Sequence, residues 1–265
     1  MVWNDHTFVV CAYGASPYLE ACVKSLLNQR LKSQILITTS TPNDEIRSLA
    51  EKYDLELRVR EGASSLAADW NFAYSQAETA YVTLAHQDDV YGKSYLQEIR
   101  RAVRAARHPL LLFTDYSELR RGRYEPENEL LRIKRLLLFP LKFDCFQASI
   151  WVRRRVLSLG NPICCPAVTY AKNSLPPVIF TEGFSSNTDW EAWERLSILK
   201  GSFVYIPRNC MAHRIHEEST TTKVIGGTGR KDEDDTMFRK FWPGWIAARI
   251  EKRYRKSEGL NSRGE

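Results

Sequence analysis

The chain has 265 residues, of which 43% are hydrophobic and 26% charged, a composition typical of a globular protein that buries a sizeable core. No apolar run approaches the ~20 residues of a membrane-spanning helix, and the first residues lack the basic and apolar regions of a secretory signal, so we expect a cytoplasmic protein. The six cysteines show no Cys-x-x-Cys spacing, which favours reduced thiols over a zinc site or a disulfide framework.

The net charge of +6 is concentrated near the C-terminus. Between residues 237 and 256 there are seven Lys or Arg side chains and one acid, Glu251. The rest of the chain is therefore close to neutral. No recognisable nucleic-acid-reading module accompanies the basic segment, so no nucleic-acid partner is expected.

The first 85 residues alternate between strand and helix patterns. Short runs rich in β-favouring residues predict strands, and apolar residues at intervals of three and four predict helices. Strands are expected at about 7–13, 34–39, 55–59 and 81–85, and helices at about 17–29, 44–53 and 66–77. This alternation is typical of an α/β fold with a mostly parallel sheet flanked by helices. Neither Gly-x-Gly-x-x-Gly nor a Walker-type Gly-Lys-Ser/Thr is present, which disfavours a dinucleotide-binding domain and a P-loop enzyme.

The pattern in the second half is less regular. We expect a fifth strand at 110–116, a hairpin followed by a helix within 118–138, and a strand at 146–152. Residues 161–184 contain four prolines and are expected to form an irregular loop over the site. A helix ending near Leu199, a strand at 201–207 and its extension at 211–216 follow.

The polar sequence from His86 to Asp89 directly follows the predicted strand at 81–85. Ligands of open parallel sheets bind at the carboxyl ends of the strands, so a site is expected there. Two carboxylates ~4 Å apart repel by about 4 kcal/mol at an effective dielectric of ~20, and a divalent cation would reverse that repulsion. Oxygen ligands of this kind suit Mg²⁺ or Mn²⁺. The alternative is that Asp88 or Asp89 caps a helix that begins near Gly92.

The ordered set of motifs resembles that of the family 2 glycosyltransferases of the GT-A fold. The matching segments are Val9–Tyr13, Cys22–Gln29, Ile35–Ser40, Trp70–Ala73, His86–Asp89, Asp189–Glu191 and Arg214–His216. The resemblance covers about residues 7–220 and implies a GT-A domain over 1–220, with a donor-binding part at about 1–117 and an acceptor part at about 118–220. Residues 221–265 are then expected to form a loop and a basic amphipathic C-terminal helix.

What the resemblance implies is a nucleotide-sugar donor, linked to UDP or GDP, that binds at the strand ends with Mn²⁺ or Mg²⁺ on its diphosphate. The implied metal ligands are Asp88, Asp89 and His216. The implied donor-binding residues are Ala12, Tyr13, Thr39, Ser40, Asn71, Gln87, Asp88, Asp89 and Arg214.

Two positions depart from the family's pattern. His86 replaces the first aspartate of the metal motif, which leaves strict metal dependence open. Thr39 or Ser40 replaces an aspartate that usually contacts the base or ribose, which leaves the base open. Tyr13 stands where the family stacks the nucleobase. Asn71 is expected to tie the backbone of the site together, or alternatively to lie on a polar helix surface.

The resemblance also assigns the chemistry. Asp189 matches the catalytic base of an inverting transfer, which takes the proton of the attacking acceptor hydroxyl. The alternative is an acid at a helix start, favoured by the helix dipole. Trp190 and Trp193 could stack on an acceptor sugar, or could belong to the core. His213 and His216 point to opposite faces of a strand, and His216 is expected to face the site.

We expect the enzyme to build a surface glycan on a glycan or lipid-linked acceptor. Two other hypotheses stay open: a nucleotidyltransferase, and a catalytically silent nucleotide-sugar-binding protein. The apolar stripe from Phe238 to Ile250, with its basic surroundings, has the composition of an interfacial helix, which would place the enzyme peripherally at the inner face of an anionic membrane. The alternative is that these aromatic residues dock on the catalytic domain.

Overall fold

The strand ends that carry the predicted site lie at one edge of a parallel block of sheet. The computed structural model describes residues 1–216 and 228–261, and the side chains of 1–216 and 232–254. The block has the order β3-β2-β1-β4 and consists of β1 (Val2–Ala12), β2 (Lys32–Thr39), β3 (Glu56–Val59) and β4 (Tyr81–His86). Ala12 pairs with Thr39 and Cys11 with His86, so the ends of three neighbouring strands meet at one edge.

The other part of the sheet is mixed. It continues from β4 with β8 (Val168–Ala171), β6 (Pro109–Arg120), β9 (Ser202–Ile215) and β5 (Val90–Tyr91), and β7 (Arg123–Glu125) pairs with β6. β8 is antiparallel to both of its neighbours, whereas β6 and β9 are parallel. Val90 lies opposite Ala212, which brings the polar tip after β4 beside the end of β9. The predicted α/β class is confirmed, with antiparallel strands added to its parallel block.

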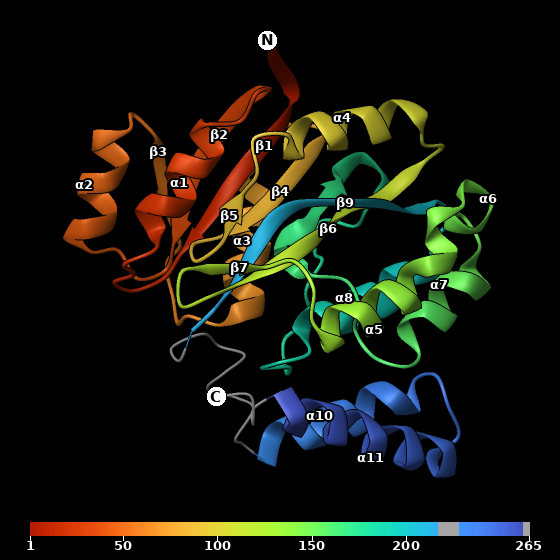
Figure 1. Cartoon of the computed structure of the whole chain (residues 1–265). Coiled ribbons are helices and arrows are strands. Elements are labelled where there is room, and N and C mark those ends of the chain that lie inside the picture. Colours follow the sequence, from red (N-terminus) through yellow and green to blue (C-terminus); the bar gives the residue numbers. More distant parts are fainter. Residues whose placement is uncertain (217–227, 262–265) are drawn as a thin grey trace.

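Helices cover both faces of the sheet (Figure 1). One apolar cluster lies between the sheet and α1 (Leu19–Leu27), α2 (Asp44–Lys52) and α4 (Tyr95–Ala105). The other packs under α3 (Leu66–Gln76), α7 (Ile150–Leu157) and α8 (Thr188–Ser197). Side-chain caps fix the starts of α2 and α3, where Asn43 accepts from the Ile46 amide and Ser65 from the Ala68 amide.

The strand predicted at 146–152 is wrong. After α5 (Glu129–Leu138) and the 3₁₀ helix η1 (Phe139–Lys142), these residues lie in α6 (Asp144–Gln147) and α7. The hydroxyl of Ser149 accepts from the Val152 amide at the start of α7, and Val152 and Val156 are buried one turn apart. Capping and helical burial therefore outweigh the β-branched and aromatic composition of this run.

The irregular loop predicted at 161–184 contains a strand. β8 lies there between two 3₁₀ helices, η2 (Cys165–Ala167) and η3 (Lys172–Ser174). Its four residues are too few to show a periodicity, and they form a strand because β4 and β6 pair with them from either side. Part of the expected loop is therefore a central strand of the sheet.

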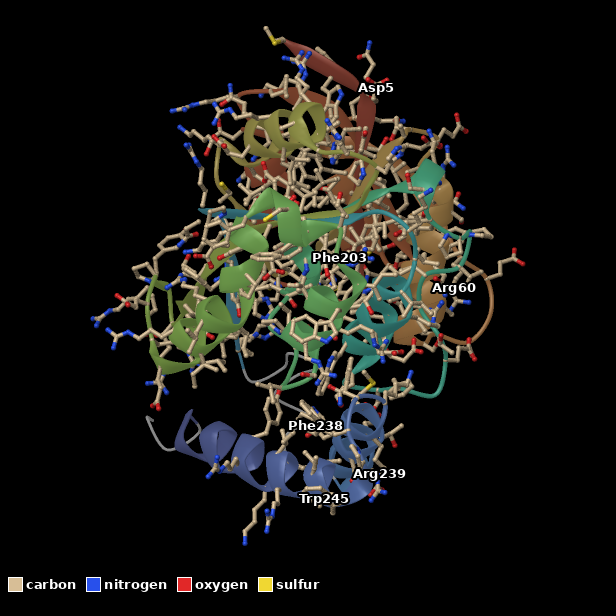
Figure 2. All side chains as sticks on the ribbon, turned by 90° about the vertical axis from the view of Figure 1, so that its right-hand side faces the viewer. Asp5, Arg60, Phe203, Phe238, Arg239 and Trp245 are labelled. Carbon is tan, nitrogen blue, oxygen red and sulfur yellow. The ribbon has the colours of Figure 1, made fainter. Side chains whose placement is uncertain are left out.

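The C-terminal segment forms two helices, α10 (Thr228–Arg239) and α11 (Gly244–Asn261), which lie side by side below the domain in Figure 1. Phe238 is fully buried and points toward the domain, whereas Trp245 is 68% exposed and lies on the far side (Figure 2). The indole of Trp242 donates to the carbonyl of Ser158. Gly160, at a φ of +143°, comes so close to Tyr254 that an added Cβ would lie 2.9 Å from the ring.

Most of the stripe predicted as an interfacial helix thus packs on the domain. This agrees with the alternative hypothesis, in which these aromatic residues dock on the catalytic domain. None of the described helices is long and apolar enough to cross a membrane. The expected boundary near residue 220 falls outside the described residues, as do the side chains of Arg255 and Lys256.

Candidate active site

Asp88 is the point where three segments of the chain meet at the end of β4. Its Oδ1 accepts from the hydroxyl of Ser16, in the loop before α1, at 3.2 Å. Its Oδ2 lies 3.2 Å from Nε2 of His216, just beyond β9. The carboxylate is partly exposed, so it remains accessible to a ligand. His216 therefore faces the site as predicted, whereas the role of Ser16 was missed because a lone loop serine gives no sequence signal.

Arg214 is held in place beside this carboxylate. Its Nε donates to the backbone carbonyl of Asp88 at 2.8 Å, and its guanidinium lies over the ring of Tyr18 at 4.3 Å from the ring centroid. The ring of Tyr18 is in turn 5.0 Å from that of His216. A cation fixed in this way can attract an anionic ligand without first losing much side-chain freedom.

Asp89 does not join Asp88 as a surface ligand. It is 1% exposed, and its Oδ1 accepts from Nδ1 of His213 and from the backbone amide of Arg214, both at 2.9 Å. Burial alone would lower the pKa of His213, but the charge of Asp89 and its hydrogen bond outweigh burial and raise it. Oδ1 of Asp89 therefore anchors the end of β9, which presents Arg214 and His216, and the metal or ribose contact of Asp89 stays a prediction.

His86, which stands in place of a carboxylate, is turned into the protein. Its ring stacks on that of Trp70, with centroids 4.8 Å apart and planes at 22°. Burial lowers its pKa, so the ring is neutral. Within the described residues, no hydrogen-bond partner reaches its Nε2. His86 thus contributes no charge to the site.

The remaining donors fit a divalent cation only in part. Asp88 and His216 supply an oxygen and a nitrogen that suit Mn²⁺ or Mg²⁺. The described part of the chain contains no group of three or more His, Cys, Asp or Glu side chains that could hold a metal ion. The two protein ligands would therefore need further oxygens from a bound ligand and water, as is usual for Mg²⁺ beside phosphates.

The ends of β1 and β2 form the neighbouring part of the edge. The amide of Gln87 bonds the backbone of Tyr13 twice, accepting from its N–H at 2.8 Å and donating to its carbonyl at 3.0 Å. The Tyr13 ring is 58% exposed and free to stack on a planar group, whereas Ala12 and Thr39 are buried. Gln87, predicted to bind donor, is engaged in holding β1 and β4 together.

Asp69, in the first turn of α3, was not predicted from the sequence as a residue of the site. Its carboxylate accepts from the hydroxyls of Ser40 (3.0 Å) and Ser64 (2.5 Å) and from Nε of Arg60 (2.7 Å). It therefore ties the end of β2 to the segment that leads into α3. Its position directly before the family motif Trp70-Asn71 could have pointed to it. Its contact with Ser40 could not be predicted, because the two residues lie 29 positions apart in the sequence.

Asn71 bonds the segment that follows β8. Its Oδ1 accepts from the amides of Ile179 and Phe180 at 3.0 and 2.9 Å, and its Nδ2 donates to the carbonyl of Phe180 at 2.7 Å. These three bonds tie α3 to a segment more than a hundred residues later, which is the backbone-tying role predicted for this side chain. They also occupy both ends of the Asn71 amide.

Asp189 lies in the first turn of α8 and is partly buried. Its Oδ2 accepts from Nδ2 of Asn161 at 2.8 Å, and its Oδ1 from the amide of Trp190. Burial raises its pKa above the ordinary aspartate value, although these hydrogen bonds oppose the shift. A carboxylate with a raised pKa binds a proton more readily, as a general base requires.

Asp189 and the end of β4 are linked through the segment that precedes β8. Asn161, which bonds Asp189, lies in this segment, and η2 farther along it packs on β4. The hydroxyl of Tyr91, just after the polar tip of β4, donates to the carbonyl of Pro166 in η2 at 2.6 Å. The segment thus connects two parts of the chain that lie about a hundred positions apart.

Trp190 and Trp193 are both fully buried. The indole of Trp190 donates to the carbonyl of Leu157, and its ring packs against Phe238. Trp193 lies against Tyr170 and Phe180. The predicted stacking of these rings on an acceptor sugar is therefore wrong for this structure, and their helical spacing reflects the core.

The start of α8 is held by α10. Both carboxylate oxygens of Glu233 accept hydrogen bonds from the backbone amides of Ser185, Ser186 and Asn187 and from the two serine hydroxyls, at 2.7–3.0 Å. The next residue, Asp234, accepts from Nδ2 of Asn187 at 2.7 Å. An anion at a helix start is also favoured by the helix dipole. The C-terminal helices thereby fix the turn that presents Asp189.

We expect Glu233→Ala to lower the free energy of unfolding by about 1–3 kcal/mol, because it leaves partly buried donors without their acceptor. Although burial opposes the shift, the hydrogen bonds lower the pKa of Glu233 to about 2. The stabilisation is therefore present above ~4.3, the ordinary glutamate pKa, and is lost as the pH falls toward 2. Denaturant unfolding at several pH values measures both effects. Asp235→Ala, which removes an ion pair from the exposed side of the same helix, is the control, and an equal loss in both variants would contradict the assignment.

Comparison with known proteins identifies the family. The model of Glycosyl transferase family 2 matches residues 7–159, more than half of the chain. The chain belongs to this family. Among curated proteins, none matches this chain by sequence.

Several solved structures share the fold of this family 2 chain at low sequence identity. TarS 1–349 of S. aureus, in complex with UDP-GlcNAc, has a TM-score of 0.61 and 15% identity, over 93% of this chain and 70% of that chain. The mannosyltransferase PcManGT of Pyrobaculum calidifontis, in complex with GDP-Man and Mn²⁺, has a TM-score of 0.59 and 15% identity, over 90% of this chain and 64% of that chain. The glucosyl-3-phosphoglycerate synthase of Mycobacterium tuberculosis, in complex with Mn²⁺ and UDP-glucose, has a TM-score of 0.57 and 12% identity, over 90% of this chain and 79% of that chain. The GT-A fold predicted for this family 2 chain is thereby confirmed.

Proposed function

We propose that this family 2 protein is an inverting glycosyltransferase that moves a sugar from a nucleoside-diphosphate donor to a hydroxyl group of a glycan or lipid-linked acceptor. The observation that carries the proposal is the cluster of Asp88, His216 and Arg214 at the end of β4, whose charges suit a cation and a diphosphate. Asp189, a partly buried carboxylate with a raised pKa, supports it.

The donor would lie along the edge formed by the ends of β1, β2 and β4. The exposed ring of Tyr13 is free to stack on the base, and Arg214 is placed to contact phosphate oxygens. Asp88 and His216 would hold Mn²⁺ or Mg²⁺, which, when bound, neutralises charge on the departing diphosphate. Complexes of the structural neighbours with UDP-GlcNAc, GDP-Man and UDP-glucose support a nucleotide-sugar donor.

The base of the donor follows less directly from the residues. Thr39 is buried, and its hydroxyl accepts from the amide of Thr41, so it does not stand in for a base-binding carboxylate. The hydroxyl of Ser40 donates to the carboxylate of Asp69, which places that carboxylate at the end of β2. Uracil and guanine both remain compatible with a stacking Tyr13, and a binding comparison of UDP and GDP separates them.

Asp189 would take the proton of the acceptor hydroxyl as the hydroxyl attacks the anomeric carbon. The bond from that carbon to the diphosphate breaks on the opposite face, which inverts the configuration. Asn161 orients one oxygen of the carboxylate, and the Trp190 amide holds the other. A surface glycan and a cytoplasmic location at the inner face of a membrane are part of this proposal.

The testing experiment measures release of free nucleoside diphosphate from UDP-GlcNAc, UDP-glucose and GDP-Man, with Mn²⁺ or with a chelator. We expect release from one donor in the presence of Mn²⁺ and little release with the chelator. Binding without any release, with acceptor sugars present, would favour the silent nucleotide-sugar-binding protein. Pyrophosphate release from a nucleoside triphosphate and a sugar phosphate would instead indicate a nucleotidyltransferase.

A further inference from the structure

A group of large apolar side chains is exposed on the outer side of the α5–α7 segment. Isolated exposed apolar residues are normal, but a contiguous group marks an interaction site. Six of them, which we call the apolar ridge, are between 43% and 73% exposed: Leu136, Phe139, Phe143, Phe146, Ile150 and Trp151.

Three aromatic rings of the ridge, those of Phe139, Phe143 and Phe146, form a row. The ring centroid of Phe143 lies 5.6 Å from that of Phe139 and 6.2 Å from that of Phe146, with the rings edge to face. The elements η1, α6 and α7, which carry most of the ridge, pack on one another. Figure 1 shows α5, α6 and α7 along one side of the molecule, away from the parallel strands.

The centre of the ridge is a short projecting tip. All five residues from 142 to 146 are exposed, whereas Leu141 and Gln147 on either side are buried. The amide of Gln147 donates to the carbonyl of Leu141 at 3.1 Å, which closes the base of the tip. Phe143 and Phe146 are thus held outward by an anchored backbone.

Two exposed cations, Lys142 and Arg155, stand beside the rings of the ridge, and Asp144 is the exposed acid at its tip. Of the other cations in residues 129–155, Arg153 is fully buried, and Arg132, Arg135 and Arg154 pair with Glu127, Asp115 and Glu194. Lys142 lies over the ring of Phe139, with Nζ 5.5 Å from its centroid. Arg155 lies over Trp151 and Trp242, at 5.8 and 4.7 Å. Exposed aromatic rings with cations beside them are the composition of surfaces that enter the headgroup region of a bilayer.

We propose that the apolar ridge docks this protein on an anionic lipid bilayer, with Phe143, Phe146 and Trp151 entering the interface and Lys142 and Arg155 meeting headgroup phosphates. A projecting tip fits a deformable lipid surface, and the two exposed cations beside the rings, Lys142 and Arg155, favour anionic lipid over an unspecified protein. Most of the stripe on the C-terminal helices is occupied by packing, and Trp245 is its exposed member, so we assign the apolar contact to the ridge rather than the tail. The inference gives a docking surface to the membrane location included in the proposed function, and it does not depend on the proposed glycosyl transfer.

Cys145 gives a direct probe of this surface. Among the cysteines of the chain, all of which the structure describes, Cys145 is exposed, Cys11 is partly buried and the other four are buried. A polarity-sensitive fluorophore on Cys145 should shift to shorter wavelength with vesicles of phosphatidylcholine and phosphatidylglycerol, and much less with phosphatidylcholine alone. The unlabelled protein should likewise float with the vesicles that contain phosphatidylglycerol, and much less with vesicles of phosphatidylcholine alone.

The decisive variant is F143S/F146S, whose exposed positions should leave the fold intact. We expect vesicle affinity to fall by at least ~10-fold, because the variant lacks the two aromatic rings that the wild type transfers from water into the lipid interface. Tyr124→Ser, an exposed aromatic on β7 outside the ridge, and K252Q/R253Q on α11 should each retain the wild-type affinity.

Three results would overturn the proposal. One is the absence of flotation for the wild type at low salt, and another is an equal affinity for F143S/F146S and the wild type. The third is self-association that F143S/F146S removes while vesicles have no effect, which would assign the ridge to a protein interface. Nucleotide binding by F143S/F146S should be unchanged, so failure of vesicle binding and failure of the proposed chemistry are separate outcomes.

Discussion

Asp189→Asn is expected to lower turnover by at least ~10²-fold, the low end of general-base contributions, while donor affinity stays nearly unchanged. The amide oxygen can still accept from the Trp190 amide, but the NH₂ group takes the place of the oxygen that accepts from Asn161, so that hydrogen bond is lost. The start of α8 should keep its shape because Glu233 still holds the turn before it. What the variant loses is the ability to take a proton. Steady-state rates of sugar transfer, together with calorimetric donor binding, measure the two quantities separately.

The same carboxylate predicts the pH dependence of the reaction. Burial raises the pKa of Asp189, so the base is protonated over a wider acidic range than an ordinary aspartate. Turnover should therefore fall on the acidic side at a pH above the usual aspartate range of about 3.9. Turnover that stays constant down to that range would show that another group takes the proton.

Asp44→Asn is the matched control for the alternative role. Asp44, like Asp189, is an acid in the first turn of a helix, but it lies in α2 and is exposed. If Asp189 only stabilises its helix, the two substitutions should reduce stability by similar amounts and leave transfer near the wild-type rate.

Asp88→Asn should abolish the divalent-cation-dependent part of nucleotide binding. An amide oxygen still accepts from Ser16, so the loop before α1 is retained, but the negative charge that a cation requires is lost. The loss should exceed the ~10–100-fold that removal of a group behind a metal ligand typically costs. Calorimetry with UDP and GDP, in the presence and absence of Mn²⁺, measures it.

Ser16→Ala is the informative companion to that variant. It removes the hydroxyl that bonds Asp88 but leaves the carboxylate, so binding should weaken far less than in Asp88→Asn. Nucleotide affinity that Mn²⁺ raises equally in the wild type and in Asp88→Asn would remove Asp88 from the metal site.

The sequence alone determined the features that depend on neighbouring residues. The alternation of apolar strands and amphipathic helices over the first 85 residues predicted the parallel block, because side-chain periodicity reports which face is buried. It also predicted a polar tip at the carboxyl end of β4. These are local patterns, and the fold reproduces them.

The tertiary structure decided the features that depend on contacts between distant parts of the chain. Asp88 and Asp89 are indistinguishable in sequence, but the end of β9 buries Asp89 against His213 and leaves Asp88 partly exposed. The four residues of β8 become a strand only between β4 and β6. Trp190 and Phe238 reach the core because the C-terminal helices pack on α8. Each of these outcomes depends on partners far away along the chain, which periodicity and spacing do not encode.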